Sequence, residues 1–217
     1  MIDYLDVSEE IKPHYPSITH LEIENITRYL QLLSSWNQRI NLTGPKDWRA
    51  ICQRLITDSF YLANFLDSLS LPADPKTLDI GAGAGIPGIP LRIIWTKGSY
   101  ILVESKQKKC SFLLYAITQL GIQNTYVASK RLEDYHPPED NCADIVLSRA
   151  FTNWQDFLNR AESIVKKNAL ALAFSNVSWQ TAENCPSSWE FLQQKEYKIA
   201  NSQKRYIWLF SLKKDSS

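Results

Sequence analysis

Glycines concentrate in one segment of this chain, and their spacing is the feature best suited to chemistry. The chain has seven glycines, and four of them lie at Gly81, Gly83, Gly85 and Gly88. A short apolar run precedes them, and an apolar run of helical character follows them. Because glycine is costly in conformational entropy, such a concentration needs a physical reason. It predicts a tight strand-to-helix turn whose backbone a ligand approaches closely, which is a cofactor loop.

Two cofactors fit the glycine spacing. Gly83, Gly85 and Gly88 form the dinucleotide pattern G-x-G-x-x-G. Gly81, Gly83 and Gly85 form G-x-G-x-G, which is typical of enzymes that use S-adenosyl-L-methionine. Glu104, at the end of the next expected strand, would accept hydrogen bonds from a ribose in either case. The glycines and Glu104 therefore predict a nucleoside-containing cofactor without choosing between the two.

Two neighbours of the glycines favour the methyl donor. Asp79 lies two residues before the first glycine, where a carboxylate can meet the cationic amino group of S-adenosyl-L-methionine and would repel an anionic pyrophosphate. Pro87 removes one backbone N–H that a pyrophosphate would otherwise use. The alternative role for Asp79 is an acid that only caps the loop. The loop is therefore interpreted as a site for S-adenosyl-L-methionine.

The segment Ser148-Arg149-Ala150-Phe151 follows the fourth expected strand, where a substrate would bind. It lacks the Asn/Asp-Pro-Pro-aromatic segment of enzymes that methylate exocyclic amines, and no Pro-Cys nucleophile of the cytosine-C5 type is present. A ring nitrogen such as guanine N7 needs neither, because its lone pair attacks the methyl group once it is positioned. Arg149 would brace the cofactor or the base, and Phe151 would stack on a base. Their alternative roles are a surface ion pair and helix packing, and no catalytic base is assigned.

The elements that position these residues alternate between strands and helices. Buried strands are expected at 77–80, 100–104, 125–128, 144–148 and 169–174, and helices at 89–95, 106–120, 151–166 and in part of 178–194. This alternation predicts an α/β fold with a doubly wound, Rossmann-like parallel sheet and right-handed crossovers. Two final runs, 198–203 and 206–212, predict an antiparallel pair at the C-terminal sheet edge.

The first 70 residues have helical periodicity instead. Apolar side chains recur at helical spacing over 18–36 and 48–66, and the segment 41–45 interrupts the pattern. Asn41 or Thr43 is expected to cap the helix that follows. The chain is therefore divided into an N-terminal helical extension, 1–70, and a methyltransferase domain, 71–217.

Composition limits the class of protein. The 217 residues are 44% hydrophobic, enough for a substantial core, and the net charge of +1 means that any nucleic-acid binding must come from a local patch. No apolar run is long enough for a membrane span, and the acidic start lacks a secretory signal, so a cytoplasmic protein is expected. A monomer is expected because no extra interface element is visible in the sequence. No metal site or disulfide is expected from the scattered cysteines, which are Cys52, Cys110, Cys142 and Cys185.

Several ordered segments resemble one known family. They are Trp36-Asn-Gln-Arg-Ile-Asn-Leu-Thr43, Asp58-Ser59, Asp79-Ile-Gly-Ala-Gly-Ala-Gly-Ile-Pro-Gly-Ile-Pro90, Glu104-Ser105 with Lys108-Lys109, Arg131-Leu-Glu-Asp134 and Ser148-Arg-Ala-Phe151, with a weaker match at Arg205. Together they resemble the bacterial glucose-inhibited division protein B family (GidB type), small-subunit rRNA guanine-N7 methyltransferases. The resemblance implies a class I methyltransferase fold, S-adenosyl-L-methionine as cofactor, and 16S rRNA or the small ribosomal subunit as partner.

The resemblance also implies site residues. In that family, the positions of Gly81, Ile86, Leu132, Glu133 and Arg149 hold the cofactor, with Leu132 and Glu133 flanking the adenine. Together with the loop analysis, the expected cofactor residues are Asp79, Gly81, Gly83, Gly85, Ile86, Glu104, Leu132, Glu133 and Arg149. Two departures from the family pattern are present, and the second, the loss of a Lys, puts the strength of substrate binding in question. Leu55 replaces a usual His, and Ser175-Asn176 replaces a usual Lys-Gly pair.

Basic residues near the loop suggest where RNA binds. The candidates are Lys106, Lys108, Lys109 and Arg205, together with Phe151, and Arg92 is also expected on the same basic face. Three other functions remain open at this point. They are a dinucleotide-dependent oxidoreductase, a methyltransferase acting on another RNA or a small molecule, and a non-catalytic rRNA-binding assembly factor.

Overall fold

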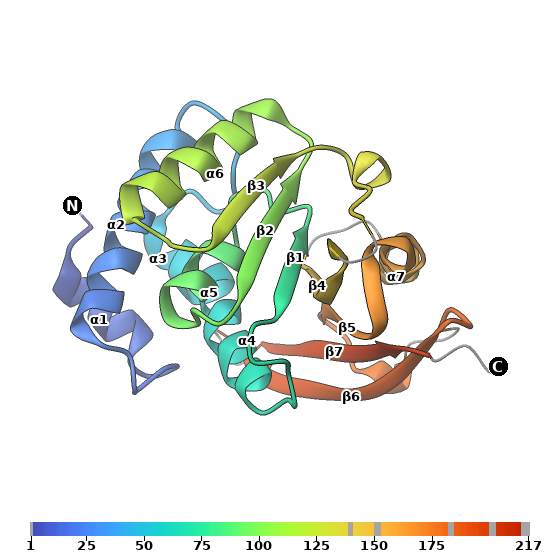
Figure 1. Cartoon of the computed structure of the whole chain (residues 1–217). Coiled ribbons are helices and arrows are strands. Elements are labelled where there is room, and N and C mark those ends of the chain that lie inside the picture. Colours follow the sequence, from blue (N-terminus) through green and yellow to red (C-terminus); the bar gives the residue numbers. More distant parts are fainter. Residues whose placement is uncertain (1, 139–140, 150–152, 182–184, 200–202, 214–217) are drawn as a thin grey trace.

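A mixed sheet forms the centre of the molecule. The computed structural model describes residues 2–138, 141–149, 153–181, 185–199 and 203–213, and within them a seven-stranded sheet runs in the order β3-β2-β1-β4-β5-β7-β6 (Figure 1). The strands are β1 (Lys76–Ile80), β2 (Ser99–Glu104), β3 (Thr125–Ser129), β4 (Ala143–Ser148), β5 (Val165–Ser175), β6 (Trp189–Lys198) and β7 (Lys204–Leu212). β1 to β5 are parallel, and β7 lies antiparallel between β5 and β6. The predicted doubly wound sheet with an antiparallel edge pair is confirmed.

Helices cover both faces of this sheet. They are α1 (Tyr4–Ile11), α2 (His20–Asn37), α3 (Trp48–Ile51), α4 (Thr57–Asp67), α5 (Gly88–Ile94), α6 (Gln107–Leu120) and α7 (Trp154–Ala161). Short 3-10 turns occur at η2 (Leu132–Asp134), η4 (Glu162–Ile164) and η5 (Trp179–Thr181). One apolar core joins α1 to α6 with one face of the sheet, and a second core lies between the other face and α7.

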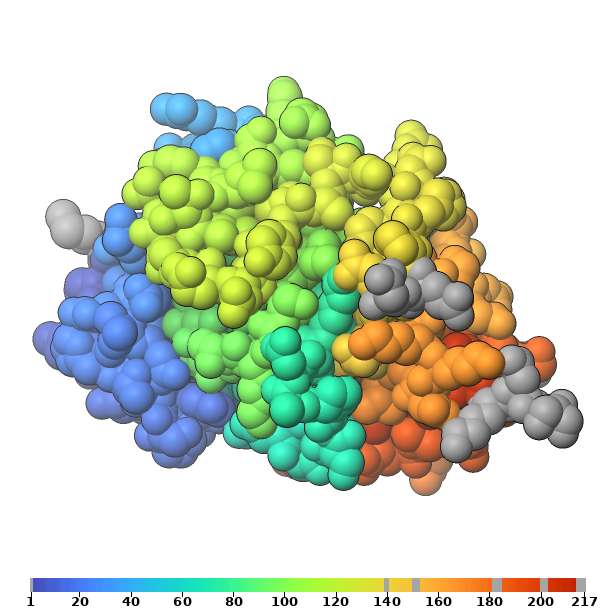
Figure 2. Space-filling view, viewed as in Figure 1, coloured from blue at the N-terminus to red at the C-terminus, as the bar shows by residue number. Residues whose placement is uncertain are grey.

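The N-terminal helices pack directly on the central part of the chain. α2 begins at a capping box, in which Thr19 and Glu22 satisfy each other's backbone N–H groups. The buried face of α2 presents Tyr29 to Phe112 of α6, with ring centroids 6.4 Å apart. Figure 2 shows the N-terminal segment against the central segment without a gap. The helices of residues 1–70 therefore complete the core over α5 and α6, while the division at residue 70 stays a prediction.

The break between the N-terminal helices is organised by one buried amide. Asn37 Oδ1 accepts the backbone N–H groups of Leu42 and Thr43 at 2.9 and 3.2 Å, and Asn37 Nδ2 donates to Thr43 Oγ1 at 2.8 Å. The predicted capping role of Asn41 or Thr43 is wrong. Asp47 caps α3, because its carboxylate accepts the N–H of Ala50 at 2.9 Å.

A π-helical turn lies inside the second predicted helix. The stretch from α3 to α4 is continuous, but η1 (Cys52–Ile56) has π geometry, and the backbone N–H of Thr57 bonds Cys52 O five residues back. The Thr57 hydroxyl donates to the same carbonyl at 2.9 Å. Inserted turns of this kind are frequent at functional sites. Here the turn immediately precedes Asp58 in α4.

Two C-terminal predictions are corrected. Among the described residues of the range 178–194, where a helix was expected, the 3-10 turn η5 is the only helical turn, and β6 occupies the end of the range from Trp189. Strand β6 ends at Lys198, so the first edge strand lies earlier than the expected 198–203, whose residues 200–202 lie outside the described part. Trp189 and Phe191 pair with Leu212 and Phe210 of β7, and this pairing selects a strand where local periodicity suggested a helix. The helix expected over 151–166 is also shorter, because β5 begins at Val165.

Two further expectations concern cysteines and membranes. All four cysteines are free thiols, and Cys52, Cys110 and Cys142 are buried, as expected. Among the described residues, no helix combines the length and apolar character needed to cross a membrane.

Candidate functional site

The glycine loop joins β1 to α5 at the carboxyl edge of the sheet. Gly81, Gly83 and Gly85 have φ values of 73°, 59° and 78°, a left-handed conformation that strongly favours glycine. The N–H groups of Gly81 and Ala82 donate to Val103 O at 2.9 and 3.1 Å, which ties the loop to β2. The loop is therefore a tight turn held against the neighbouring strand.

Glu104 is held rigidly beside this loop. Its Oε2 accepts the N–H of Gly83 at 2.9 Å, and its Oε1 accepts the N–H of Lys106 at 2.8 Å. The side chain is 7% exposed, yet it lines a cavity. Since two backbone donors fix the carboxylate, its remaining acceptor positions face that cavity without a further ordering cost. Hydroxyl groups of a ribose are suitable donors for them.

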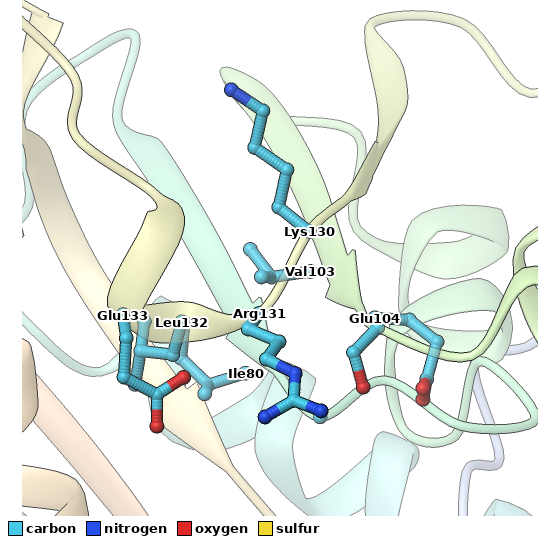
Figure 3. Close-up of a pocket in the computed structure, with 9 residues that line it drawn as sticks. Ile80, Val103, Glu104, Lys130, Arg131, Leu132 and Glu133 are labelled. Atoms are coloured by element: carbon cyan, nitrogen blue, oxygen red, sulfur yellow. The ribbon is translucent and has the colours of Figure 1, made fainter.

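The cavity beside Glu104 has a volume of about 240 Å³ and lies between the ends of β1 and β2 and the turn η2. It is lined by Ile80, Gly81, Val103, Glu104, Ser105, Lys130, Arg131, Leu132 and Glu133. In the view of Figure 3, the guanidinium of Arg131 lies between Glu133 and Glu104, while Lys130 extends away. Four residues named from the sequence, Gly81, Glu104, Leu132 and Glu133, therefore meet in one cavity.

Three further polar residues line this cavity, although the sequence predicts no individual role for them. Arg131 and Lys130 directly follow β3, and Ser105 directly follows β2. Their position just after a parallel strand is a signal that sequence analysis can use, because such residues meet at one sheet edge. Glu133 forms an ion pair with Arg160 of α7, which holds the η2 wall against the second helical layer.

Asp79 lies beneath the loop rather than in the cavity. Its carboxyl is 1% exposed, accepts the Tyr100 hydroxyl at 3.2 Å and bonds the backbone N–H of Gly88. Burial raises the pKa of Asp79 from 3.8 to about 7, against the lowering effect of these hydrogen bonds. In this position Asp79 joins β1 to the start of α5 and to β2. Its proposed contact with a cofactor amino group stays a prediction.

Gly85, Ile86 and Gly88 serve packing in this structure. A Cβ at Gly85 would lie 2.6 Å from Ile89 Cδ1, and one at Gly88 would lie 2.6 Å from Asp79 Oδ2. Ile86 is 6% exposed and belongs to the core on the α5 side. The glycine pattern therefore combines a turn at Gly81 and Gly83 with close helix–sheet contact at the later positions.

A second polar cavity lies across β4 from the glycine loop. It has a volume of about 220 Å³ and is lined by Asp58, Arg149, Phe174, Ser175, Asn176 and Arg205. Arg149 is thus brought together with Arg205, although the first was assigned to the cofactor and the second to RNA. Of the two departures from the family pattern, the Ser175-Asn176 pair lies in this same cavity, and Leu55 is not among its lining residues. Phe151 lies outside the described residues.

The basic residues separate into two groups. Lys106 and Lys108 are exposed at the start of α6, and Lys109 is half-buried with its amine close to Gly83. They lie at the same sheet edge as the loop. Arg92, in contrast, was wrongly expected on the basic face. It is 3% exposed and donates to carbonyl groups of the α5–β2 connection and of Gln123.

Comparison with known proteins agrees with this geometry. The family model for GidB, described as rRNA small subunit methyltransferase G, matches residues 22–207. A ribosomal RNA small subunit methyltransferase G from Lawsonia intracellularis is 40% identical over 197 residues, covering 89% of this chain and 88% of the relative. The protein of the same name from Oleidesulfovibrio alaskensis is 32% identical over 203 residues, covering 90% and 88%.

Solved structures support the fold. The crystal structure of P. horikoshii TYW2 in complex with MeSAdo superposes with a TM-score of 0.51 at 20% identity, covering 66% of this chain and 59% of the other. At this identity the likeness concerns the fold alone. Family membership favours the methyl-donor interpretation of the glycine loop over the dinucleotide interpretation. The match over residues 22–207, together with the two relatives, shows that the chain belongs to the GidB family of rRNA small subunit methyltransferases G.

Proposed function

We propose that this protein transfers the methyl group of S-adenosyl-L-methionine to N7 of a guanine in 16S rRNA of the small ribosomal subunit. The observation that carries the proposal is the family match over residues 22–207, because this range contains both cavities at the carboxyl edge of the sheet. The proposal includes a monomeric enzyme that works in the cytoplasm.

The first cavity suits S-adenosyl-L-methionine. Glu104 offers fixed acceptors for ribose hydroxyls, Leu132 offers an apolar surface for adenine, and the exposed backbone at Gly81 offers polar groups for the methionine part. Glu133 and Arg131 line the same cavity. When bound, the cofactor supplies an electrophilic methyl group on its sulfonium. The proposed cofactor residues remain Asp79, Gly81, Gly83, Gly85, Ile86, Glu104, Leu132, Glu133 and Arg149.

Methyl transfer to guanine N7 does not require a general base from the protein. The N7 lone pair is unprotonated at neutral pH, so the main contribution is to hold the base in line with the methyl group. Arg149 directly follows β4, between the two cavities, and is suited to orient the acceptor side. Lys106, Lys108, Lys109 and Arg205, with Phe151, remain the proposed RNA contacts.

The experiment supplies purified protein with radiolabelled S-adenosyl-L-methionine and small subunits from a strain that lacks its own enzyme. Digestion of the 16S rRNA and mass spectrometry of the nucleosides should detect labelled 7-methylguanosine. Label in a different nucleoside would overturn the guanine-N7 assignment. Absence of label, with cofactor binding intact, would leave the non-catalytic rRNA-binding factor as the better description. Label on a low-molecular-weight acceptor alone would favour the small-molecule methyltransferase.

A further inference from the structure

Asp58 is a fully buried carboxylate that lies outside the first cavity and is not among the proposed cofactor residues. It lies in the first turn of α4 and is 0% exposed. Arg149 Nε donates to Asp58 Oδ2 at 2.6 Å, Arg205 Nη1 donates to both oxygens at 2.8 and 3.0 Å, and the Tyr197 hydroxyl donates to Oδ1 at 2.8 Å. A buried charge is tolerated only when it is paired and hydrogen-bonded in this way.

The Asp58 cluster carries surplus positive charge. It contains one carboxylate and two guanidinium groups, and guanidinium stays protonated in proteins. The side chains of Arg149 and Arg205 are only 20% and 16% exposed, so solvent screens this charge weakly. An anion entering the adjacent cavity would neutralise it.

The same two arginines have donors to spare. Among the described residues, the Nη groups of Arg149 have no hydrogen-bond partner, and Arg205 Nε is buried without one. The Nη1 of Arg205 is occupied by Asp58 and by the carbonyl of Arg54, which the π-helical turn presents at 2.8 Å. Guanidinium groups held by one edge and free on the other form a rigid donor array, which matches phosphate oxygens.

The second cavity lies at the same sheet edge as the proposed cofactor cavity. Ser148 Oγ donates to Ile80 O at 3.1 Å, so the end of β4 is joined to the residue that precedes the glycine loop. Arg149 follows on the other side of β4. A phosphate bound by Arg149 and Arg205 would therefore lie beside the cofactor cavity at the same sheet edge.

We propose that this cavity binds a phosphodiester group of the RNA substrate and that Asp58 is the positioning residue that holds both guanidinium groups for it. The inference rests on the proposed function. The acceptor base itself is the poorer occupant, because methylation at N7 makes guanine cationic and the cluster is already positive. Phosphate contacts fix the position of the strand, while base contacts select the sequence.

The first test removes one guanidinium with Arg205→Met. Affinity for unmethylated 16S rRNA should fall about tenfold, as expected for losing a charge-assisted hydrogen bond. The slope of log K against log salt should decrease by about 0.7, the value for one phosphate contact on a single strand. Affinity for S-adenosylhomocysteine should not change.

Arg28→Met is the matched control. Arg28 is exposed on α2 and donates to Gln119 near the C-terminal end of α6, away from the cavity. The Arg28→Met substitution removes one positive charge, as Arg205→Met does. It therefore measures how much net charge alone changes the affinity for rRNA. Its rRNA affinity should stay close to that of the wild type.

Asp58→Asn separates positioning from simple electrostatics. The substitution raises the net charge by one, so long-range attraction alone would strengthen RNA binding. Loss of the anchor for the two arginines should weaken it several-fold instead. If this variant does not fold, Tyr197→Phe removes only one hydrogen bond to Asp58 and keeps every charge. It should weaken rRNA binding in the same direction by a smaller factor.

Three outcomes would overturn the inference. One is an Arg205→Met variant with unchanged rRNA affinity and salt slope. Another is weaker rRNA binding with the wild-type slope, which would indicate a base contact. The third is an equal loss of S-adenosylhomocysteine affinity, which would assign the cavity to the cofactor. Methyl transfer by the wild type is measured separately, so failure of the proposed function is distinguishable from failure of the phosphate site.

Discussion

Asp79 gives the clearest prediction at the scale of one residue. Burial raises the pKa of Asp79 from 3.8 to about 7. At pH values between these two, the carboxyl is protonated in the folded protein and ionised in the unfolded chain. The stability from this group is present below its unfolded pKa of 3.8 and is lost as pH rises through about 7. Asp79→Asn stays neutral, so it should gain up to about 4 kcal/mol on the wild type between these limits.

The measurement for Asp79 is denaturant unfolding of both proteins at several pH values. The difference in free energy of unfolding should move in favour of Asp79→Asn as pH rises. Parallel curves for the two proteins would mean that the carboxyl keeps an ordinary pKa, and would contradict the burial argument.

The glycines differ from one another in their tolerance of a side chain. A Cβ at Gly83 would make only ordinary van der Waals contacts, the nearest at 3.7 Å, so Gly83→Ala should cost only the backbone strain of about 1–2 kcal/mol. Gly85→Ala adds contacts of 2.6 and 2.9 Å with Ile89 and Leu113, and should cost a further 1–3 kcal/mol or so. If urea unfolding gives the same loss of unfolding free energy for Gly83→Ala and Gly85→Ala, the side chain of Ile89 must move to make room for the new Cβ.

At the scale of elements, two N-terminal helices hold the glycine loop. The Tyr29 hydroxyl of α2 donates to Ala84 O at 2.7 Å, and Ser59 Oγ of α4 donates to Pro87 O at 3.0 Å. Both bonds are buried, and each contributes about 1 kcal/mol. The helical segment therefore supports the cofactor loop from outside the sheet.

We expect Tyr29→Phe and Ser59→Ala each to lower the free energy of unfolding by about 1 kcal/mol. Both should also weaken S-adenosylhomocysteine binding in calorimetry, because the loop loses an anchor. Tyr126→Phe is the control, since Tyr126 is 57% exposed on β3. Normal cofactor affinity in both loop variants would show that the sheet alone holds the loop.

At the scale of the whole molecule, the two predicted parts share one core. Ile89, Leu91, Phe112 and Leu113 are 0% exposed and belong to the same apolar cluster as the buried residues of α2 and α4. A chain shortened to residues 71–217 would expose these side chains to water. It should therefore lose cooperative unfolding in a thermal circular dichroism scan, whereas the full chain keeps it. A sharp transition of the shortened chain would support an independent domain.

The sequence by itself determined the strand–helix order from β1 to β5, the glycine turn and the position of Glu104 at the end of β2. Apolar periodicity and left-handed glycine are local properties, and in a parallel sheet the strand ends must meet at one edge. The error in β6 arose because pairing with β7 overrode a local pattern.

Only the tertiary structure decided which charges meet. Asp58 lies 91 positions from Arg149 and 147 from Arg205 in the chain, yet all three share one cavity. The fold also buried Arg92 and turned Asp79 under the loop. Burial and charge pairing depend on which distant elements end at the same edge of the sheet and exclude water there. The local spacing of residues in the sequence does not contain this information.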